Sequence, residues 1–360
     1  MKVGILTFHC ADNYGAVLQA YALQEYLKSL GHEAFIINYR PKYLTFHYRI
    51  FVNSLPDGSV LMKLKYFLRN VLIAPIRLKR HLSFASFRKK HLNCLNIDLN
   101  EPYNNLDIFI FGSDQIWNST ITNGLDEIFF GNFVASTNKK LIAYAASAGS
   151  TLNINNTQKI FFQEHLSKFY AIGVREKSLL NFLKPLQCFL TIDPVLLAGQ
   201  ELFNKIAQYN IKGKYLLLFQ LGDNHDVEKI AFQVGRKKKL PIIKINSSSE
   251  SLKDRKVISS ASPELFLSYI KNASYVVTPS FHGTAFSILF KKDFTSVCLS
   301  SIEGERIVNL LQQLGLQNRI ATLDSSLFNT ESIDYSIAYK LYELFRNDSK
   351  IFIQKTIGGR

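Results

Sequence analysis

Residues 3–38 read VGILTFHCADNYGAVLQAYALQEYLKSLGHEAFIIN, and this stretch decides the fold. Val3–Phe8 is a short apolar run typical of a buried strand, and apolar residues then recur at helical spacing as far as Leu30. Gly31 ends that helix, because glycine tolerates the left-handed backbone conformation that a helix end often needs. Ala34–Asn38 is the next strand. The order strand, helix, strand predicts a βαβ unit, which commits the chain to a parallel sheet.

Strand and helix patterns alternate in the same way along both halves of the chain. In the first half, buried strands are expected at Leu106–Phe111, Leu141–Ala146 and Tyr170–Val174. In the second half, they are expected at Tyr215–Gln220, Pro241–Ile245, Tyr275–Thr278 and Phe294–Cys298. We therefore predict an α/β protein with two Rossmann-like doubly wound domains that face each other across a cleft. This is the GT-B-like arrangement of sugar-transferring enzymes.

The expected domains follow from these patterns. Residues 1–190 form the N-terminal Rossmann-like domain, with a basic amphipathic insertion at about residues 41–100. Residues 191–330 form the C-terminal Rossmann-like domain. Residues 331–360 form a helical segment that is expected to pack back on the N-terminal domain.

The formal net charge of +15 is concentrated in the insertion. Residues 41–100 carry eleven Lys or Arg against Asp57 and Asp98, a net charge of +9. Apolar residues interleave with these charges, which indicates amphipathic helices. Such a segment suits a nucleic acid, an anionic membrane or an anionic substrate, although a solvated helical face explains it equally well. No nucleic-acid-binding motif accompanies it, so no nucleic-acid partner is expected.

The cysteines and the apolar runs indicate the compartment. Four cysteines lie far apart, which predicts reduced thiols in a reducing compartment and no zinc site. The N-terminal residues lack the pattern of a secretory signal, and no apolar run is long enough to span a bilayer. We expect a cytoplasmic protein, with the inner face of the plasma membrane as a candidate position.

Polar loops follow four of the predicted strands, where ligands bind in open α/β sheets. The first loop is His9–Ala16, at a helix N-terminus. Its residues Asn13, Tyr14 and Gly15 can receive an anion or a sugar hydroxyl. An equally good interpretation is a capped helix start, with Asn13 as the cap.

The second and third loops carry charged side chains. Phe111–Asn118 reads FGSDQIWN, and its Asp114 can orient or deprotonate a sugar hydroxyl, or can simply shape a turn. Arg175 ends the next such strand and suits a carboxylate or a phosphate, although an ion pair with Glu176 is the alternative. Asp193 is expected to shape a turn or to pair with Arg175 rather than to act chemically.

The fourth loop, Thr278–Ala285, is the most informative. A buried strand stops at a proline, and a helix begins at or near His282. The helix N-terminus favours an anion, and His282 can donate to a phosphate or shuttle a proton near neutral pH. Lys291 and Lys292 follow at the end of the same element.

The sequences of these four loops, and their order along the chain, resemble those of the polysaccharide pyruvyltransferase family. The matching strings are DNYGAVLQAYAL, FGSDQIWN, VREKS, IDPVLL, PSFHGTAFSILFKK and GERIVNLLQQLGL, and they span about residues 1–320. The resemblance implies a GT-B-like fold and phosphoenolpyruvate as donor of a pyruvyl group. It also implies acceptors in cell-surface polysaccharides or their lipid-linked precursors. One departure is Pro279, where members often carry an acidic residue.

The loop chemistry and the resemblance together give the expected site. The catalytic residues are expected to be His282, Asp114 and Arg175. Donor binding is expected on the C-terminal side, at Arg175, Ser280, Phe281, His282, Gly283, Thr284, Lys292 and Arg306. Acceptor binding is expected on the N-terminal side, at Asn13, Tyr14, Gly15, Ser113, Asp114, Gln115 and Trp117. This chemistry needs no metal and no cofactor besides the donor substrate, and no metal-ligand spacing is present.

The implied partners are phosphoenolpyruvate and a sugar on a polyprenyl diphosphate, with the basic insertion docked on the anionic membrane that holds such a lipid. The main alternative is a GT-B glycosyltransferase that uses a nucleotide sugar. It needs an acidic residue for the ribose, and Glu303 and Glu305 are the nearest candidates. A further alternative is a non-catalytic, membrane-associated assembly protein, which would be expected to have lost the polar loops.

Overall fold

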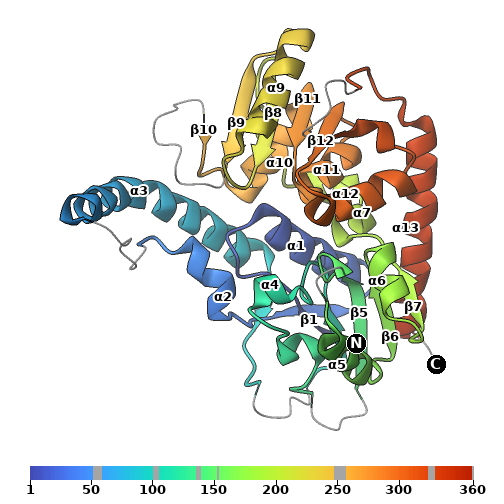
Figure 1. Ribbon diagram of the computed structural model, residues 1–360. Coiled ribbons are helices and arrows are strands. Elements are labelled where there is room, and N and C mark those ends of the chain that lie inside the picture. Colours follow the sequence, from blue (N-terminus) through green and yellow to red (C-terminus); the bar gives the residue numbers. More distant parts are fainter. Residues whose placement is uncertain are drawn as a thin grey trace.

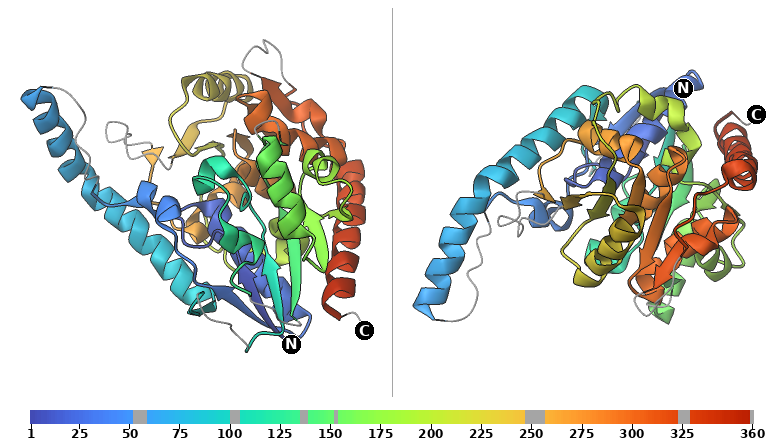
Figure 2. Two further views of the ribbon diagram at one scale, coloured as in Figure 1. Left: turned by 60° about the horizontal axis from the view of Figure 1, so that its bottom comes forward. Right: turned by 90° about the horizontal axis from the view of Figure 1, so that it is seen from above.

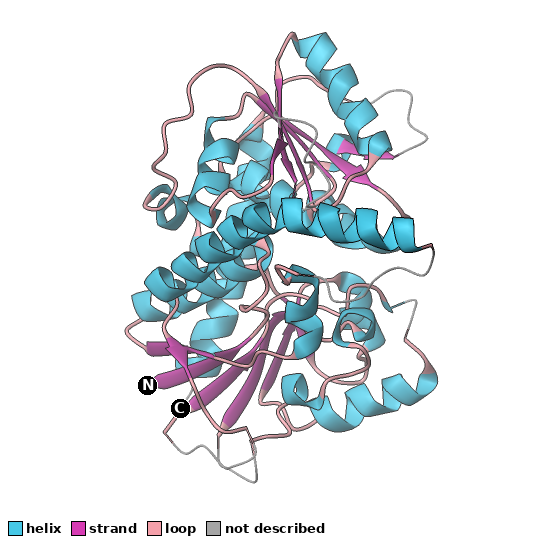
Figure 3. Cartoon of the chain, turned by 90° about the vertical axis from the view of Figure 1, so that its left-hand side faces the viewer, coloured by secondary structure: helices cyan, strands magenta, loops and turns pink. Residues whose placement is uncertain are grey.

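The computed structural model describes residues 1–51, 59–99, 105–134, 139–151, 154–246, 257–322 and 329–358, and of residues 301–303 the backbone alone. Within these ranges the chain forms two sheets, the second above the first in Figure 1. The first has seven strands in the order β3-β2-β1-β4-β5-β6-β7, and the second has six in the order β10-β9-β8-β11-β12-β13. All their pairings are parallel. Figure 3 shows both sheets from another side, with helices around each.

The strands and helices have the following bounds. The first sheet contains β1 (Lys2–Leu6), β2 (Glu33–Ile37), β3 (Cys94–Leu95), β4 (Ile108–Phe111), β5 (Lys140–Ala146), β6 (Ala171–Val174) and β7 (Cys188–Leu190). The second contains β8 (Leu216–Gln220), β9 (Ile242–Asn246), β10 (Val257–Ile258), β11 (Tyr275–Thr278), β12 (Phe294–Cys298) and β13 (Ile320–Thr322). The α-helices are α1 (Tyr14–Ser29), α2 (Lys42–Thr45), α3 (Val60–His91), α4 (Ser119–Thr122), α5 (Asn156–Leu166), α6 (Lys177–Phe182), α7 (Pro194–Ala198), α8 (Gln200–Asn204), α9 (His225–Lys238), α10 (Pro263–Asn272), α11 (Phe281–Leu289), α12 (Ser301–Gln313) and α13 (Tyr335–Gly358). Short 3-10 turns are η1 (Phe46–Tyr48), η2 (Glu127–Phe130) and η4 (Gln317–Arg319).

The predicted fold class is confirmed, since both halves are α/β with a parallel sheet. Each central strand lies within a residue or two of its predicted position. The strands that sequence analysis missed are β3, β7, β10 and β13, which lie at the four sheet edges. They are two or three residues long, too short to show a periodic pattern.

The strand order reverses once in each sheet. In the first sheet the reversal lies between β1 and β4, and in the second it lies between β8 and β11. Helices leave to opposite sides at such a point, so a crevice opens outside the carboxyl ends of the two strands. Each sheet therefore has one position where the topology itself makes room for a ligand.

A shared apolar core holds the two halves together. The Tyr14 ring stacks on the Phe266 ring of α10 at 4.2 Å, and its hydroxyl donates to the carbonyl of Ala261 at 2.9 Å. The largest cluster of buried apolar side chains likewise includes Val17 from the first half and Leu217 from the second. Because α1 is packed on both sides, the loops at the two sheet reversals are held at a fixed distance from each other.

Helix α13 runs back from the second half toward the first. The hydroxyl of Tyr342 donates to the carbonyl of Leu196, and the backbone N–H of Ile192 donates to Oγ of Ser349 at 2.8 Å. Further along the helix, the Phe352 ring lies beside that of Tyr144 on β5. Helix α13 thus contacts residues 192–196 and strand β5, and the predicted domains, including the placing of residues 331–360, stay a prediction.

The basic insertion contains one long helix, α3, of 32 residues. Its C-terminal part is anchored to the loop after β1, where Asp12 accepts a 2.9 Å hydrogen bond from Arg88 and lies 2.8 Å from His81. Its N-terminal end extends beyond the two sheets (Figures 1 and 2). Of the helices in the described ranges, none is both long and apolar enough to cross a membrane.

Candidate active site

Two adjoining cavities lie between the carboxyl ends of the two sheets. The wide cavity has a volume of about 610 Å³ and the narrow cavity about 400 Å³. They share part of their lining, namely Gln115, Thr120, Ile121, Leu221, Pro279, Ser280 and Arg306. The loops after β1, β4, β8 and β11 all contribute, so the cavities lie at the reversal points of both sheets. This is where α/β proteins bind their ligands.

Two helix N-termini meet at the narrow cavity. His282, in the first turn of α11, packs directly on Gly15 of α1, where a Cβ atom would lie only 2.1 Å from its Nδ1. Asn13 caps α1 and Ser280 caps α11, each accepting a 3.3 Å hydrogen bond from a backbone N–H of the first turn. Both caps border the narrow cavity. Converging N-termini give this cavity a positive potential that favours an anion.

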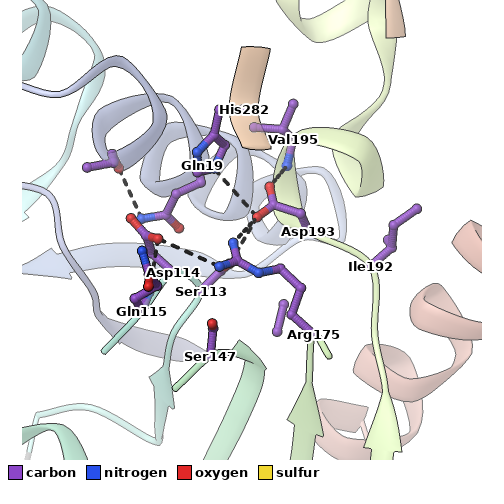
Figure 4. Close-up of polar contacts among 12 residues, drawn as sticks. Gln19, Ser113, Asp114, Gln115, Ser147, Arg175, Ile192, Asp193, Val195 and His282 are labelled. Carbon is purple, nitrogen blue, oxygen red and sulfur yellow. Dashed lines mark hydrogen bonds and ion pairs between the residues drawn. The ribbon is translucent and has the colours of Figure 1, made fainter. Parts of the chain in front are cut away.

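Asp193 joins His282 to Arg175 (Figure 4). Its Oδ2 lies 2.9 Å from Nη1 of Arg175 and 3.6 Å from Nε2 of His282, and it accepts a 3.3 Å hydrogen bond from Ser113. Burial alone would raise the pKa of Asp193, but the contacts with His282 and Arg175 outweigh burial and hold that pKa well below its usual value. Asp193 therefore stays ionised and orients the His282 ring.

Arg175 is the centre of a buried charge cluster. Its guanidinium lies 3.1 Å from Oε1 of Glu176 and 3.8 Å from Oδ1 of Asp114, in addition to Asp193. The ring of Phe281 lies 4.5 Å from its Cζ. Arg175 lines neither cavity. In this arrangement the guanidinium lies behind the cavity wall and is paired with carboxylates, and the expected direct contact of Arg175 with the donor stays a prediction.

Arg306 is the guanidinium that borders both cavities. The amide of Gln115 lies 3.1 and 3.3 Å from its two terminal nitrogens. Within the described chain no carboxylate forms an ion pair with it, and burial together with the charge of Arg175 lowers its pKa. An anion in either cavity would offset this positive charge.

The loop after β4 directs two side chains toward the cavities. Asp114 has φ of 74°, in the left-handed region that Asp and Asn enter more readily than most residues. Its Oδ1 accepts a 2.9 Å hydrogen bond from the backbone N–H of Gln115. Asp114 borders the narrow cavity and Gln115 borders both, while Ser113 is fully buried and tied to Asp193.

The wide cavity is rich in neutral polar groups. Hydroxyl and amide side chains from both halves line it, namely Asn118, Ser119, Thr120, Ser150, Gln158, Gln220 and Asn224. Trp117 adds an apolar surface, and its Nε1 donates to the carbonyl of Phe129 at 3.1 Å. Neutral donors and acceptors beside an aromatic ring suit a sugar.

Besides Arg175 and Ser113, five predicted contacts do not line the cavities. Gly15 lies against the His282 ring. Tyr14 lies in the core between the halves, and Gly283 packs tightly against β11. The Thr284 hydroxyl is buried and bonded within the protein. Lys292 lies beyond the C-terminal end of α11, at the opposite end from His282. The structure gives these five residues packing or hydrogen-bonding roles within the protein, and ligand contact at their positions stays a prediction. No group of three or more His, Cys, Asp or Glu in the described ranges is placed to hold a metal ion.

Two parts of the lining escaped sequence analysis. Tyr43, Leu44, His47 and Tyr48 line the narrow cavity, although they belong to the basic insertion and carry no recognisable motif. The loop Leu221–Asn224 lines the wide cavity, and its position after a buried strand could have signalled it. Asp193 was noted as a partner of Arg175, but its approach to His282 depends on tertiary structure.

Comparison with known proteins gives the family of the chain and agrees with its fold. The family described as "Polysaccharide pyruvyl transferase" matches residues 13–297, so the chain belongs to this family of transferases. No curated protein matches the chain by sequence.

Two solved structures share the GT-B-like arrangement. A putative UDP-N-acetylglucosamine 2-epimerase from Listeria monocytogenes superposes with a TM-score of 0.52 at 10% identity, covering 100% of this chain and 97% of that one. The UDP-GlcNAc 2-epimerase from Neisseria meningitidis, solved with UDP-GlcNAc, gives 0.51 at 10% identity and covers 100% of both chains. At such identities the likeness describes the fold alone.

Proposed function

We propose that the protein transfers a pyruvyl group from phosphoenolpyruvate to two hydroxyls of one sugar, forming a pyruvate ketal and releasing phosphate. The acceptor sugar belongs to a cell-surface polysaccharide or to its polyprenyl-diphosphate-linked precursor. Membership of the pyruvyl transferase family supports the reaction class. The observation that carries the donor assignment is the narrow cavity, where Arg306 meets the capped N-termini of α1 and α11.

Phosphoenolpyruvate carries a carboxylate and a phosphate, and the narrow cavity has a positive group for each. Arg306 can bind one of them through two parallel hydrogen bonds, since its charge has no carboxylate partner in the described chain. The N-termini of α1 and α11 bind the other. Arg175 acts from behind as a positioning residue, because it fixes Asp193 and contacts the Phe281 ring.

The reaction forms two carbon–oxygen bonds and breaks one. First, a sugar hydroxyl oxygen bonds to C2 of phosphoenolpyruvate and loses its proton, while C3 takes up one proton and becomes a methyl group, so that no net proton is consumed. Next, the bond between C2 and the phosphate oxygen breaks, and phosphate leaves with the electron pair. The second hydroxyl oxygen then bonds to C2, and the proton that it loses balances the one taken up by the leaving phosphate. His282 is proposed to bind and protonate the leaving phosphate, and Asp114 to orient or deprotonate the acceptor hydroxyl.

The acceptor sugar is proposed to occupy the wide cavity. Its hydroxyl and amide lining suits a neutral sugar, and Gln115 and Ser280 border both cavities. A sugar there would present its hydroxyls to a donor in the narrow cavity, near Asp114. Of the expected acceptor contacts, this proposal keeps Gln115 and Trp117 in the wide cavity, with Asn13 and Asp114 at the narrow one.

Incubation of the protein with phosphoenolpyruvate and a panel of sugars and lipid-linked sugars tests the proposal. One phosphate released for each ketal, with the ketal identified by mass spectrometry, is the expected result. His282→Gln should lower this turnover by about 10²–10⁴-fold, the typical contribution of a general acid. Turnover of a nucleotide sugar, with none of phosphoenolpyruvate, would replace the proposal with a glycosyltransferase.

A further inference from the structure

We infer that the outward face of helix α3 docks the protein on an anionic lipid bilayer. The exposed apolar residues of this face are Leu61, Leu64, Leu68, Val71, Leu72, Leu78 and Leu82. Most of them recur at alternating steps of three and four residues, so they form one continuous stripe on the helix. The stripe spans about 32 Å, at 1.5 Å for each residue.

The opposite face of α3 is the one attached to the protein. Ile73, Phe84 and Phe87 are buried, and Arg88 is bonded to Asp12 in the loop after β1. From Leu61 to Leu72 the exposed stripe therefore points away from the body. Further along the helix, Leu78 and Leu82 are exposed but line a hollow beside the second half of the chain. The residues of the stripe are unusually open to solvent, since Leu61 is 61% exposed and Leu72 is 69% exposed. A contiguous apolar surface of this size marks an interaction site.

The charge of α3 identifies the partner. The helix carries nine Lys or Arg and no Asp or Glu. Lys63, Lys65 and Lys79 are exposed and lie among the apolar residues. An apolar stripe accompanied only by positive charges is the pattern of a helix that lies in the interface of an anionic membrane.

A second copy of the chain fits this face less well. The spacing of the stripe would suit a coiled coil, but paired helices need complementary charges beside the apolar seam. Two copies of α3 would bring nine positive charges against nine others, with no carboxylate on either helix. Repulsion therefore disfavours self-association, while an anionic surface gains from the charges of this helix that are exposed. Arg80 and Arg88 are not among them, because both are buried against the loop after β1.

Docking of α3 would place the cavities close to the membrane surface. The segment just before this helix contains Leu44, His47 and Tyr48, which line the narrow cavity. The loop held by Arg88 carries Asn13, which borders the same cavity. The docked helix is thus joined to the cavity at two points, and an acceptor carried on a lipid would reach it without leaving the bilayer. The docking inference itself does not depend on the proposed reaction.

Sedimentation of the full-length protein with vesicles tests the inference. We expect the protein to pellet at low salt with vesicles of phosphatidylcholine and phosphatidylglycerol, and to be released from them by high salt. It should not bind vesicles of pure phosphatidylcholine. Lys63→Gln with Lys65→Gln should weaken binding by about thirtyfold. Leu61→Gln, Leu64→Gln and Leu68→Gln together should weaken it by about a hundredfold.

The matched control is Ile337→Gln with Leu344→Gln, which removes two exposed apolar residues from α13 and should leave vesicle binding unchanged. Failure of the wild-type protein to bind phosphatidylglycerol vesicles would overturn the inference, as would equal binding by the leucine variant. If the wild-type protein self-associates with rising concentration in the absence of lipid and the leucine variant does not, a second copy of the chain covers this face instead. Thermal stabilisation by phosphoenolpyruvate is measured on the same proteins. Vesicle binding tests the docking of α3 and this stabilisation tests the donor site, so either proposal can fail without the other.

Discussion

Replacing Gly15 with Ala tests whether the position of the His282 ring controls the donor chemistry. The added methyl group would lie 2.1 Å from Nδ1 and 2.6 Å from Cγ of His282, whereas ordinary van der Waals contact begins at 3.4 Å. The ring must therefore shift by about 1.3 Å, because helix α1 is packed on both sides and has no room to move. The shift would disturb the approach of Nε2 to Asp193.

The expected loss follows from this displacement. A misplacement of about 1 Å typically costs about 10²-fold in rate, so kcat/KM for phosphoenolpyruvate should fall by at least that factor. The fold should survive, because Ala favours a helix over Gly by roughly 1 kcal/mol and offsets part of the crowding. The defect should thus appear in catalysis rather than in stability.

The assay is phosphate release from phosphoenolpyruvate in the presence of an acceptor, with thermal unfolding of each variant alongside. Gly358→Ala is the matched control, since it also places Ala in a helix but meets nothing within 4 Å. It should behave as the wild type. If Gly15→Ala keeps the wild-type kcat/KM while folded, the position of His282 does not govern the reaction and the reasoning is refuted.

Three further predictions address charge, burial and the contact between the halves. Arg306→Gln should weaken phosphoenolpyruvate binding, measured by calorimetry, by at least about tenfold, because a charge-assisted hydrogen bond is lost. The control Arg236→Gln, on the surface of α9, should bind phosphoenolpyruvate as the wild type does. Equal affinities of the Arg306 variant and the wild type would remove Arg306 from the donor site. The lowered pKa of Asp193 means that its contribution to stability is fully present above its unfolded pKa of about 4 and is lost as pH falls below that value. Between pH 6 and pH 2, the Tm of the wild type should therefore fall more steeply than the Tm of Asp193→Asn. Parallel curves of Tm against pH would contradict this. Tyr14→Phe keeps the ring but leaves the Ala261 carbonyl without its donor, so urea unfolding should show a loss of about 1–3 kcal/mol, and an unchanged midpoint would contradict the role of this bond.

Much of the fold could be predicted because its central strands are long, apolar and separated by clear helical patterns. The βαβ unit at residues 3–38 already requires a parallel sheet. Strands β4, β8 and β11 are recognisable in the sequence as apolar runs typical of buried strands. The edge strand β3 could not be found in this way, since Cys94–Leu95 is too short for any pattern. Likewise, interleaved charges and leucines indicated amphipathic helices but not one continuous helix of 32 residues.

The site was predictable as a set of loops but not as a geometry. Four strand ends with polar residues were visible in the sequence, although the loop Leu221–Asn224 was missed. The loops with Asp114 and His282 do border one cavity. Which of these side chains face the cavity and which pair with one another depends on distances between residues far apart in the chain. Sequence alone named both Arg175 and Arg306 as donor contacts, whereas in the structure Arg306 lines both cavities and Arg175 lines neither.

The most direct test of the central claim is thermal unfolding of the protein with phosphoenolpyruvate, set against UDP, UDP-sugars and inorganic phosphate. Specific binding predicts about 2.7 kcal/mol of stabilisation at a hundredfold excess over Kd. This stabilisation should be lost in Arg306→Gln and His282→Ala, which remove the two side chains proposed to hold the donor. Stabilisation by UDP or a UDP-sugar, with none from phosphoenolpyruvate, would contradict the account and assign the cavities to a nucleotide sugar.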